Sequence, residues 1–244
     1  MIDEFEERIL YAYGDIITDP INVEQGSEDW QIMRLGVPSA SNAEKILNTN
    51  RKGDDLGETA KAYVYQLCGE VMTKEKHSIA SNNAMNWGVE FEPEARDRIN
   101  TEYHYEGETE AVFEFPFIPC QSSFFGASPD GLCFGNVFHN GIEIKCPYNS
   151  SEHVKHILNG KDGIKKEYIS QVLFSMYVTG LDWDFYTYDP RNTVIDLHST
   201  TFRVKDYKEE LKEIHIKAER FKNYYIAQLK ELGLNYGDQW KEKF

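Results

Sequence analysis

The chain has 244 residues, of which 41% are hydrophobic and 14% aromatic, so it is long and apolar enough to fold around a substantial core. Its formal net charge of −15 at pH 7 argues against a protein that coats nucleic acid through bulk positive charge. No apolar run approaches membrane-spanning length, and the acidic start MIDEFEERIL lacks a signal-peptide pattern, so we expect a cytoplasmic protein with no membrane contact.

The placement of charges and cysteines along the chain indicates further what kind of protein this is. Residues 1–30 carry nine acidic residues and one basic residue, a formal −8, whereas residues 145–170 carry five lysines against three acids. An acidic protein can still bind a polyanion at a cleft where bound divalent ions reverse the local charge. The four cysteines form no C-x-x-C pair, which predicts reduced and mostly buried thiols in an intracellular chain.

Helical patterns dominate the first part of the chain. The segment 2–13 has apolar residues at helical spacing, and SASNAEKIL (39–47) is typical of a helix start, with Ser39 or Ser41 as N-cap. Further helices are predicted over 57–72 and over 84–101, the latter bent near Pro93.

The middle of the chain changes to short apolar or alternating runs separated by Gly, Pro and Asn, which indicate strands at AVFEFPFIP, FFGASPDGLCF and GIEIKCP. A helix over 165–180 follows and ends at Gly180, and WDFYTYDP is an aromatic-rich strand whose rings we expect in the core. One or two strands in TVIDLHSTTFRV and a long helix over 206–232 complete the chain. This order, with no internal repeat or linker, predicts one α/β domain around a central mixed sheet flanked by helices.

The segment GIEIKCP carries the first chemical signal. As a strand, it buries Ile142 and Ile144 on one face and presents Glu143 and Lys145 on the other. A hairpin around GNVFHN would bring Asp130, in the turn SPDG, close to Glu143. Two carboxylates at one point form a site for a hard cation such as Mg²⁺, and a neighbouring amine can steady a phosphate or a water. These groups suit phosphodiester hydrolysis, although spacing alone equally allows a surface hairpin with an ordinary Glu/Lys pair.

Six motifs in order decide between these alternatives. They are WQIMRLGVPSAS (30–41), WGVEFEPEAR (87–96), GASPDGLC (126–133), GIEIKCP (141–147), YISQVLFSMYVTG (168–180) and YDPR (188–191). Over about residues 24–191 the chain resembles the phage lambda exonuclease and YqaJ-like viral recombinase family, within the PD-(D/E)XK restriction-endonuclease-like nuclease superfamily. The resemblance implies a restriction-endonuclease-like α/β core. We expect a single nuclease domain over 1–244, with an acidic helical extension (1–23), a catalytic core (24–191) and a C-terminal strand and long helix (192–244).

The resemblance also implies roles for individual residues. The metal would be held by Asp130, Glu143, the backbone carbonyl of Ile144 and Glu92, with Lys145 as the catalytic lysine and Gln171 facing the active centre. A pocket for a 5′-phosphate would be lined by Arg34, Ser41 and Ser128, a donor set that suits a phosphate dianion.

Several of these residues have ordinary alternatives. Glu90 or Glu94 could replace Glu92 as the ligand, and Gln171 could be an exposed helix residue. Arg34 could pair with Glu28 or Asp29 on the surface, and Ser41 could be an N-cap alone or as well.

Three further features lie outside the motif set. Met85 is a candidate wedge that parts terminal base pairs, and Arg51 in the loop NTNRKGDDLG is a candidate DNA contact, with an ordinary surface role as the alternative for both. His153 and His156 have a metal-like H-x-x-H spacing, but the family pattern does not require them and we expect structural or surface roles.

The function implied by the resemblance is a Mg²⁺-dependent 5′→3′ exonuclease that degrades one strand of linear double-stranded DNA to mononucleotides from a 5′-phosphorylated end. Two Mg²⁺ ions are expected, with Mn²⁺ as a substitute. The remaining 3′ single strand would serve phage recombination with a single-strand annealing protein as partner, in the cytoplasm of a host bacterium. A homotrimeric ring that threads DNA would explain how an acidic protein holds its substrate. The alternatives are an endonuclease or repair nuclease on the same fold, or a catalytically silent protein that binds DNA ends.

Overall fold

The structure is a computed structural model that describes residues 2–77, 82–105, 111–134 and 138–241. Its helices are α1 (Ile2–Tyr13), α2 (Glu28–Arg34), α3 (Ala43–Ile46), α4 (Glu58–Thr73), α5 (Asn83–Tyr105), α6 (Ser150–Asn159), α7 (Lys166–Thr179) and α8 (Lys208–Glu231). Its strands are β1 (Ala111–Phe113), β2 (Ile118–Pro119), β3 (Gly126–Ala127), β4 (Gly131–Phe134), β5 (Phe138–Lys145), β6 (Asp182–Tyr188) and β7 (Leu197–Phe202). Within these ranges, no helix is both long and apolar enough to span a bilayer.

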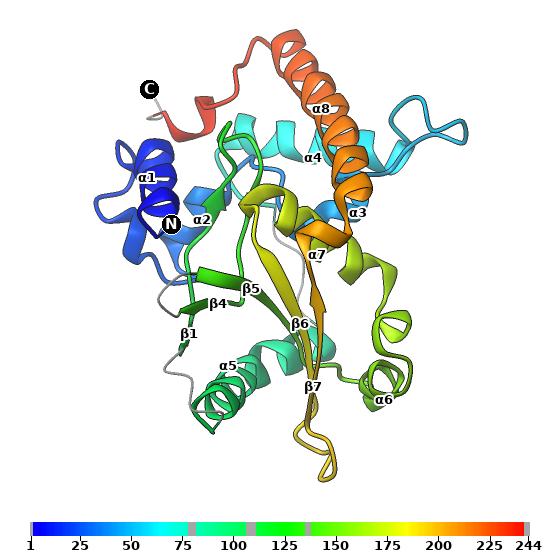
Figure 1. Ribbon diagram of the computed structural model, residues 1–244. Coiled ribbons are helices and arrows are strands. Elements are labelled where there is room, and N and C mark those ends of the chain that lie inside the picture. The colour runs from blue at the N-terminus through cyan, green and yellow to red at the C-terminus, as the bar shows by residue number, and fades with distance from the viewer. Residues whose placement is uncertain (1, 78–81, 106–110, 135–137, 242–244) are drawn as a thin grey trace.

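A five-stranded sheet with the order β1-β4-β5-β6-β7 forms the centre of the molecule, with α5 on one side and α7 and α8 on the other (Figure 1). β5 and β6 run parallel, whereas the other neighbouring strands are antiparallel. A parallel pair needs a crossover connection, which α6 and α7 supply here. The predicted α/β fold with a central mixed sheet is therefore confirmed.

Apolar side chains cover both faces of the sheet. On the α5 face, Ala95 and Ile99 pack with Ile142 and Ile144 of β5. On the opposite face, Trp183 and Phe185 of β6 pack against α7, and the aromatic set predicted as core in this strand is buried. Gly141 of β5 permits this packing, because a Cβ at this position would lie 2.4 Å from the Trp183 ring. β5 is thus a central strand with both faces covered, which determines the environment of Glu143 and Lys145.

A further apolar cluster lies between α4, α7 and α8 and includes Tyr63, Phe174 and Phe221. The C-terminal segment then returns to the N-terminal helices (Figure 1), where Trp240 contacts Tyr13 edge-on at 5.6 Å and donates to the Ile32 carbonyl at 2.8 Å. The two ends of the chain therefore pack together.

The predicted helices over 2–13, 57–72, 84–101 and 206–232 are confirmed with small shifts of their ends. The predicted helix over 165–180 is α7, which ends at Gly180 in the left-handed conformation. One strand, β7, forms in the segment predicted to hold one or two. The sequence analysis missed two short helices, α2 and α6, which begin at side-chain caps from Ser27 and Asn149.

The helix predicted from SASNAEKIL is only partly present. A 3-10 turn over 40–42 precedes the one-turn α3, and neither Ser39 nor Ser41 caps a helix with its side chain. The reason is that the Ser41 hydroxyl accepts a hydrogen bond from Arg34 and pairs with the Ser39 hydroxyl. Ser39 thus occupies the predicted N-cap position, ahead of the 3-10 turn, but the hydroxyls of Ser39 and Ser41 are used in a side-chain pocket instead of a cap.

Candidate active site

Asp130 lies in the turn before β4 and is fixed to β5 by two hydrogen bonds. Its N–H donates to the Ile142 carbonyl at 3.0 Å, and its Oδ2 accepts from the Ile144 N–H at 2.7 Å. The antiparallel register pairs Gly131 with Ile142, as the predicted hairpin requires. The hairpin's turn, residues 135–137, lies outside the described residues. The pairing places the Asp130 carboxylate directly beside the strand that carries Glu143 and Lys145.

Glu143 is fully buried, with no exposed surface, and it does not emerge from the sheet as the strand pattern predicted. Its Oε1 accepts hydrogen bonds from Lys145 Nζ and from Gln171 Nε2, the latter at 2.6 Å. Its Oε2 is buried and has no hydrogen-bond partner. The prediction assumed one solvated face of the strand, but α7 covers the face that Glu143 occupies. Gln171, on α7, therefore points to the active centre rather than to solvent.

Charge at this point is concentrated in a low-dielectric environment. Burial raises the pKa of Glu143 to about 8, and repulsion by Asp130 adds to the shift. Burial also raises the pKa of Asp130, although Lys145 opposes the shift. Burial alone would lower the pKa of Lys145, but Glu143 and Asp130 more than reverse this and raise it. Burial thus disfavours the ionised form of both carboxylates, and a bound cation would favour it by balancing their negative charge.

Glu92 on α5 joins this group from the other side of the sheet. Burial raises its pKa to about 7, with repulsion by Asp130 as the second cause. Its Oε1 accepts from Arg96 at 2.9 Å, and the same guanidinium donates through Nε to the Asp130 carbonyl at 2.8 Å. Glu94 instead accepts from the Tyr188 hydroxyl at 2.6 Å. The geometry thus favours Glu92 over Glu94 as the helical carboxylate of the site.

The residues present fit a divalent cation of the hard type. Among the described residues, no three Asp, Glu, His or Cys side chains gather closely enough to hold a metal ion by themselves. Mg²⁺ does not need such a cage, because it binds through one or two carboxylates plus waters and substrate phosphate. The unpartnered Oε2 of Glu143 and the adjacent Asp130 carboxylate supply this number of ligands.

Arg34 forms a second polar pocket with two hydroxyl groups. Its guanidinium donates to Ser128 Oγ at 3.2 Å and to Ser41 Oγ at 3.3 Å, and it lies 4.0 Å from the Trp30 ring centre. Within the described part of the chain, Arg34 makes no ion pair with an acidic side chain, and burial lowers its pKa. Ser128 stands two residues before Asp130, so this pocket adjoins the carboxylate site along the chain. A half-buried guanidinium bonded only to neutral groups is suited to bind an anion.

Comparisons with known proteins agree with this geometry. Residues 29–182 match the model of the YqaJ-like viral recombinase domain. The chain belongs to the YqaJ-like viral recombinase family. The structure superposes on an alkaline exonuclease from Laribacter hongkongensis, LHK-Exo, with a TM-score of 0.71 and 30% identity over 85% of this chain and 96% of that one.

A second structure of LHK-Exo and two further proteins are also similar to this recombinase-family chain. LHK-Exo in complex with dAMP gives a TM-score of 0.67 at 29% identity, over 85% of this chain and 98% of that one. A phage-related exonuclease from Haemophilus somnus 129PT shares the fold, with a TM-score of 0.60 at 14% identity over 80% of this chain and 96% of that one. An uncharacterized protein of Escherichia coli strain K12, ExoD, is 34% identical over 90 residues, which are 36% of this chain and all of ExoD. These matches confirm the predicted class, a nuclease of the exonuclease type and of the phage recombination family.

Sequence reasoning missed the residues that support the site in this YqaJ-like chain. Arg96 connects Glu92 with the Asp130 turn, and it lies 3.6 Å from Glu114 as well. On the Arg34 side, Lys76 donates to the Arg34 carbonyl at 3.0 Å and to the buried Glu70 at 2.8 Å. An unexplained Arg inside the motif WGVEFEPEAR was the available signal for Arg96, whereas nothing in the sequence pointed to Lys76 or Glu70.

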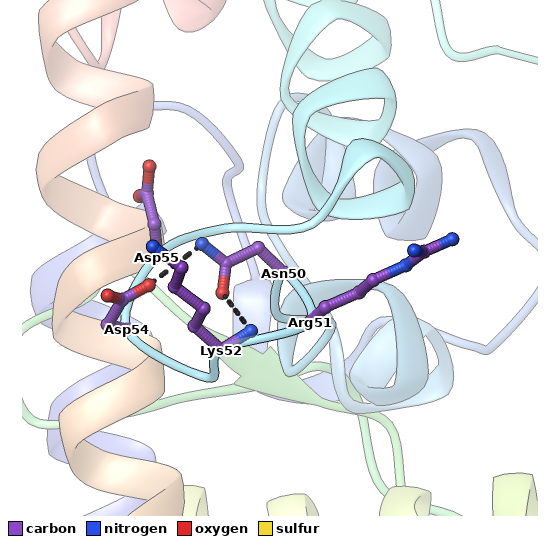
Figure 2. Close-up of a pocket in the computed structure, with 5 residues that line it drawn as sticks. All are labelled: Asn50, Arg51, Lys52, Asp54 and Asp55. Carbon is purple, nitrogen blue, oxygen red and sulfur yellow. Dashed lines mark hydrogen bonds between the residues drawn. The ribbon is translucent and has the colours of Figure 1, made fainter.

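Two of the predicted DNA contacts remain predictions. Met85 is 46% exposed in the first turn of α5, where Asn82 Oδ1 accepts from its N–H at 3.0 Å. Figure 2 shows that Arg51 extends away from Asp54 and Asp55, the acidic residues of its loop. The loop itself is held by Asn50, which donates to Asp54 Oδ1 at 2.8 Å and accepts from the Lys52 N–H at 3.1 Å. Among the described residues, no side-chain hydrogen bond or ion pair of Met85 or Arg51 assigns them another role.

His153 and His156 have structural roles. Both are buried, and the Nδ1 atoms of both lie 2.8 Å from the Thr187 hydroxyl. The Nε2 atoms pair with the Ile195 carbonyl and the Thr200 hydroxyl, at 2.8 and 2.9 Å. Burial lowers the pKa of His156 to about 4, so the ring is neutral at neutral pH. These internal hydrogen bonds agree with the expected structural roles of the two histidines. All four cysteines are free and buried, as predicted.

Proposed function

We propose that the protein is a 5′→3′ exonuclease that degrades one strand of linear double-stranded DNA from a 5′-phosphorylated end. The observation that carries this proposal is the adjacency of two sites of different chemistry. The first site is the buried carboxylate pair of Asp130 and Glu143 with Lys145, in which Glu143 Oε2 lacks a partner among the described residues. The second site is the Arg34 pocket, whose Ser128 stands two residues before Asp130 in the chain. The first suits a metal-assisted phosphodiester hydrolysis, and the second suits a terminal phosphate.

In this proposal, Asp130, Glu143 and the backbone carbonyl of Ile144 hold Mg²⁺, two ions in all, and Mn²⁺ can substitute. The bound metal supplies a nucleophilic water at neutral pH and neutralises charge on the scissile phosphate. Glu92 holds the water shell, and Arg96 keeps Glu92 in place. Gln171 orients Glu143 through its hydrogen bond to Oε1, and Oε2, which has no partner among the described residues, would be the metal ligand.

Lys145 acts by its charge. In the protein without bound metal, Glu143 and Asp130 raise the pKa of Lys145 despite its burial and so favour the protonated amine. It can donate to a phosphate oxygen and stabilise the negative charge that develops there. The water gives up a proton to solvent as it attacks phosphorus, the P–O3′ bond breaks, and the departing O3′ takes a proton from solvent.

Arg34, Ser41 and Ser128 would hold the 5′-terminal phosphate and so place the next phosphodiester at the carboxylates. Cleavage there would release a mononucleotide. LHK-Exo forms a complex with dAMP, a deoxynucleoside monophosphate of the type expected as product. The remaining 3′ single strand would be the substrate of a single-strand annealing protein in phage recombination, in the cytoplasm of the host.

Assembly and domain boundaries follow the same family argument. We infer a homotrimeric ring around DNA, since topological enclosure would hold a polyanion on a chain with a formal charge of −15. The core over 24–191 would carry catalysis, and the segments 1–23 and 192–244 would extend it at either end.

A strand-labelled duplex tests the chemistry. With Mg²⁺, the parent protein should release mononucleotides from the 5′-phosphorylated strand only, and Lys145→Ala should slow release by roughly 10²–10³-fold. Lys155→Ala is the matched control, because Lys155 is exposed and, among the described residues, its ammonium group pairs with Glu152 alone. Release from the 3′ end, or a Lys145→Ala protein as active as the control, would contradict the proposal.

A further inference from the structure

An aromatic cluster lies where the catalytic strand leaves the sheet. Tyr148 stands three residues after Lys145, and its side chain is 52% exposed. Its ring meets the Trp87 ring edge-on, with centres 5.9 Å apart, and Trp87 packs on Phe91 of the same helix at 4.3 Å. The ring of Tyr148 is therefore supported on its inner side and open to solvent on the other.

Arg191 fixes this arrangement. Its guanidinium lies 4.3 Å from the centre of the Trp87 ring, and its Nη2 donates to the carbonyls of Pro147 and Tyr148 at 3.2 and 3.1 Å. The same side chain forms two hydrogen bonds to the buried carboxylate of Asp189, at 2.7 and 3.0 Å. Arg191 thus connects the backbone of Tyr148, the Trp87 ring and the loop after β6.

The sheet register places this arrangement at the active site. β5 and β6 are parallel, and Lys145 lies opposite Thr187, so the segments that carry Tyr148 and Arg191 leave the same end of the sheet. Three residues of extended chain reach at most about 11 Å, so Tyr148 lies close to Lys145 at this end of the sheet. The open ring of Tyr148 is therefore within a few nucleotides of a phosphate bound at Lys145.

We propose that Tyr148, supported by Trp87 and Arg191, is a stacking subsite for an unpaired DNA base next to the scissile phosphate. Aromatic rings stack on any base, because every base has a π face, and such contacts contribute to single-strand binding without reading sequence. Tyr148 would hold the end of the substrate strand after it separates from its complement. This subsite rests on the proposed function, since it assumes that a DNA end enters the carboxylate site.

The test measures binding in chelator, where cleavage does not occur. The probe is a fluorescent duplex with a 5′-phosphate and a short fork of unpaired thymidines. A second probe has abasic residues in place of the thymidines on the 5′-phosphorylated arm. Tyr148→Ala and Tyr148→Phe are compared with the parent and with Tyr11→Ala, because Tyr11 is an exposed tyrosine on the distant helix α1.

We expect Tyr148→Ala to bind the thymidine fork roughly 5- to 100-fold more weakly than the parent does. It should bind the abasic fork as strongly as the parent does. Tyr148→Phe and Tyr11→Ala should match the parent on both probes. The subsite is contradicted if Tyr148→Ala weakens both probes equally, or neither, or if the parent binds the two forks alike. Failure of the stacking proposal can be distinguished from failure of the exonuclease proposal. If Tyr148→Ala weakens binding only when bases are present, but the parent shows no metal-dependent cleavage, the stacking subsite is supported and the exonuclease activity is contradicted.

Discussion

Glu143→Gln provides a test of the buried carboxylate that does not depend on activity. Burial raises the Glu143 pKa from 4.5 to about 8 in the folded protein, so between these values the folded state holds a proton that the unfolded chain has released. The stabilisation from this proton is complete below pH 4.5 and is lost as the pH rises through about 8. Each pKa unit corresponds to 1.36 kcal/mol, so the wild-type free energy of unfolding should fall by about 3–4 kcal/mol from pH 5 to pH 8 through this group.

The assay is urea unfolding with chelator at several pH values between 5 and 8. The difference in free energy of unfolding, wild type minus Glu143→Gln, should fall across this range, whereas the difference for the exposed Glu210→Gln should stay constant. Glu92, whose pKa burial raises to about 7, contributes to both proteins and largely cancels in the difference. Added Mg²⁺ should stabilise the wild type increasingly as pH rises, because the ion binds the ionised carboxylate. A wild-type minus Glu143→Gln difference that does not change with pH would refute the reasoning.

Three further variants test the surrounding residues. Arg34→Lys keeps the charge but loses the planar guanidinium group, so the preference for a 5′-phosphate over a 5′-hydroxyl in end binding should fall roughly tenfold or more. The control, Arg220→Lys, should keep the preference of the parent. An unaltered preference in Arg34→Lys would show that Arg34 does not bind the phosphate. Arg96→Gln should weaken Mg²⁺ binding, measured by calorimetry, by roughly 10–100-fold. The control, Arg98→Gln, removes contacts to Glu102 and Asp196 and should bind Mg²⁺ as the parent does. Equal effects of the two variants would contradict a positioning role for Arg96. His153→Ala should lower the free energy of unfolding by about 1–3 kcal/mol with or without chelator, and a loss that appears only when metal is present would instead indicate a metal ligand.

The strand pattern of GIEIKCP predicted correctly which residues share a face, because alternation is a property of the strand alone. It could not predict that Glu143 is buried, since that depends on α7, which begins more than twenty residues later in the chain and packs over the same face. The pairing of Asp130 with β5 followed from the turn residues between two strands, and the structure has this pairing.

The residues that escaped prediction act through contacts distant in sequence. Arg96 reaches Asp130 across 34 positions, and Arg191 reaches Tyr148 across 43. Neither contact has a local signature in the sequence. An arginine in a helix, or one after a proline, looks the same in the sequence whether it supports a site or lies on an ordinary surface. Similarly, the serines of SASNAEKIL fit an N-cap pattern, and only the approach of Arg34 shows that their hydroxyls face a pocket.

The most direct measurement is a digestion time course on one linear duplex with a 5′-phosphate at one end and a 5′-hydroxyl at the other, beside a closed circle of the same sequence, with Mg²⁺ and with chelator. We expect Mg²⁺-dependent loss that begins at the phosphorylated end, with the circle intact. Cutting of the circle would identify an endonuclease, and absence of cleavage with Mg²⁺ or Mn²⁺ would contradict a catalytic role for the site formed by Asp130, Glu143 and Lys145.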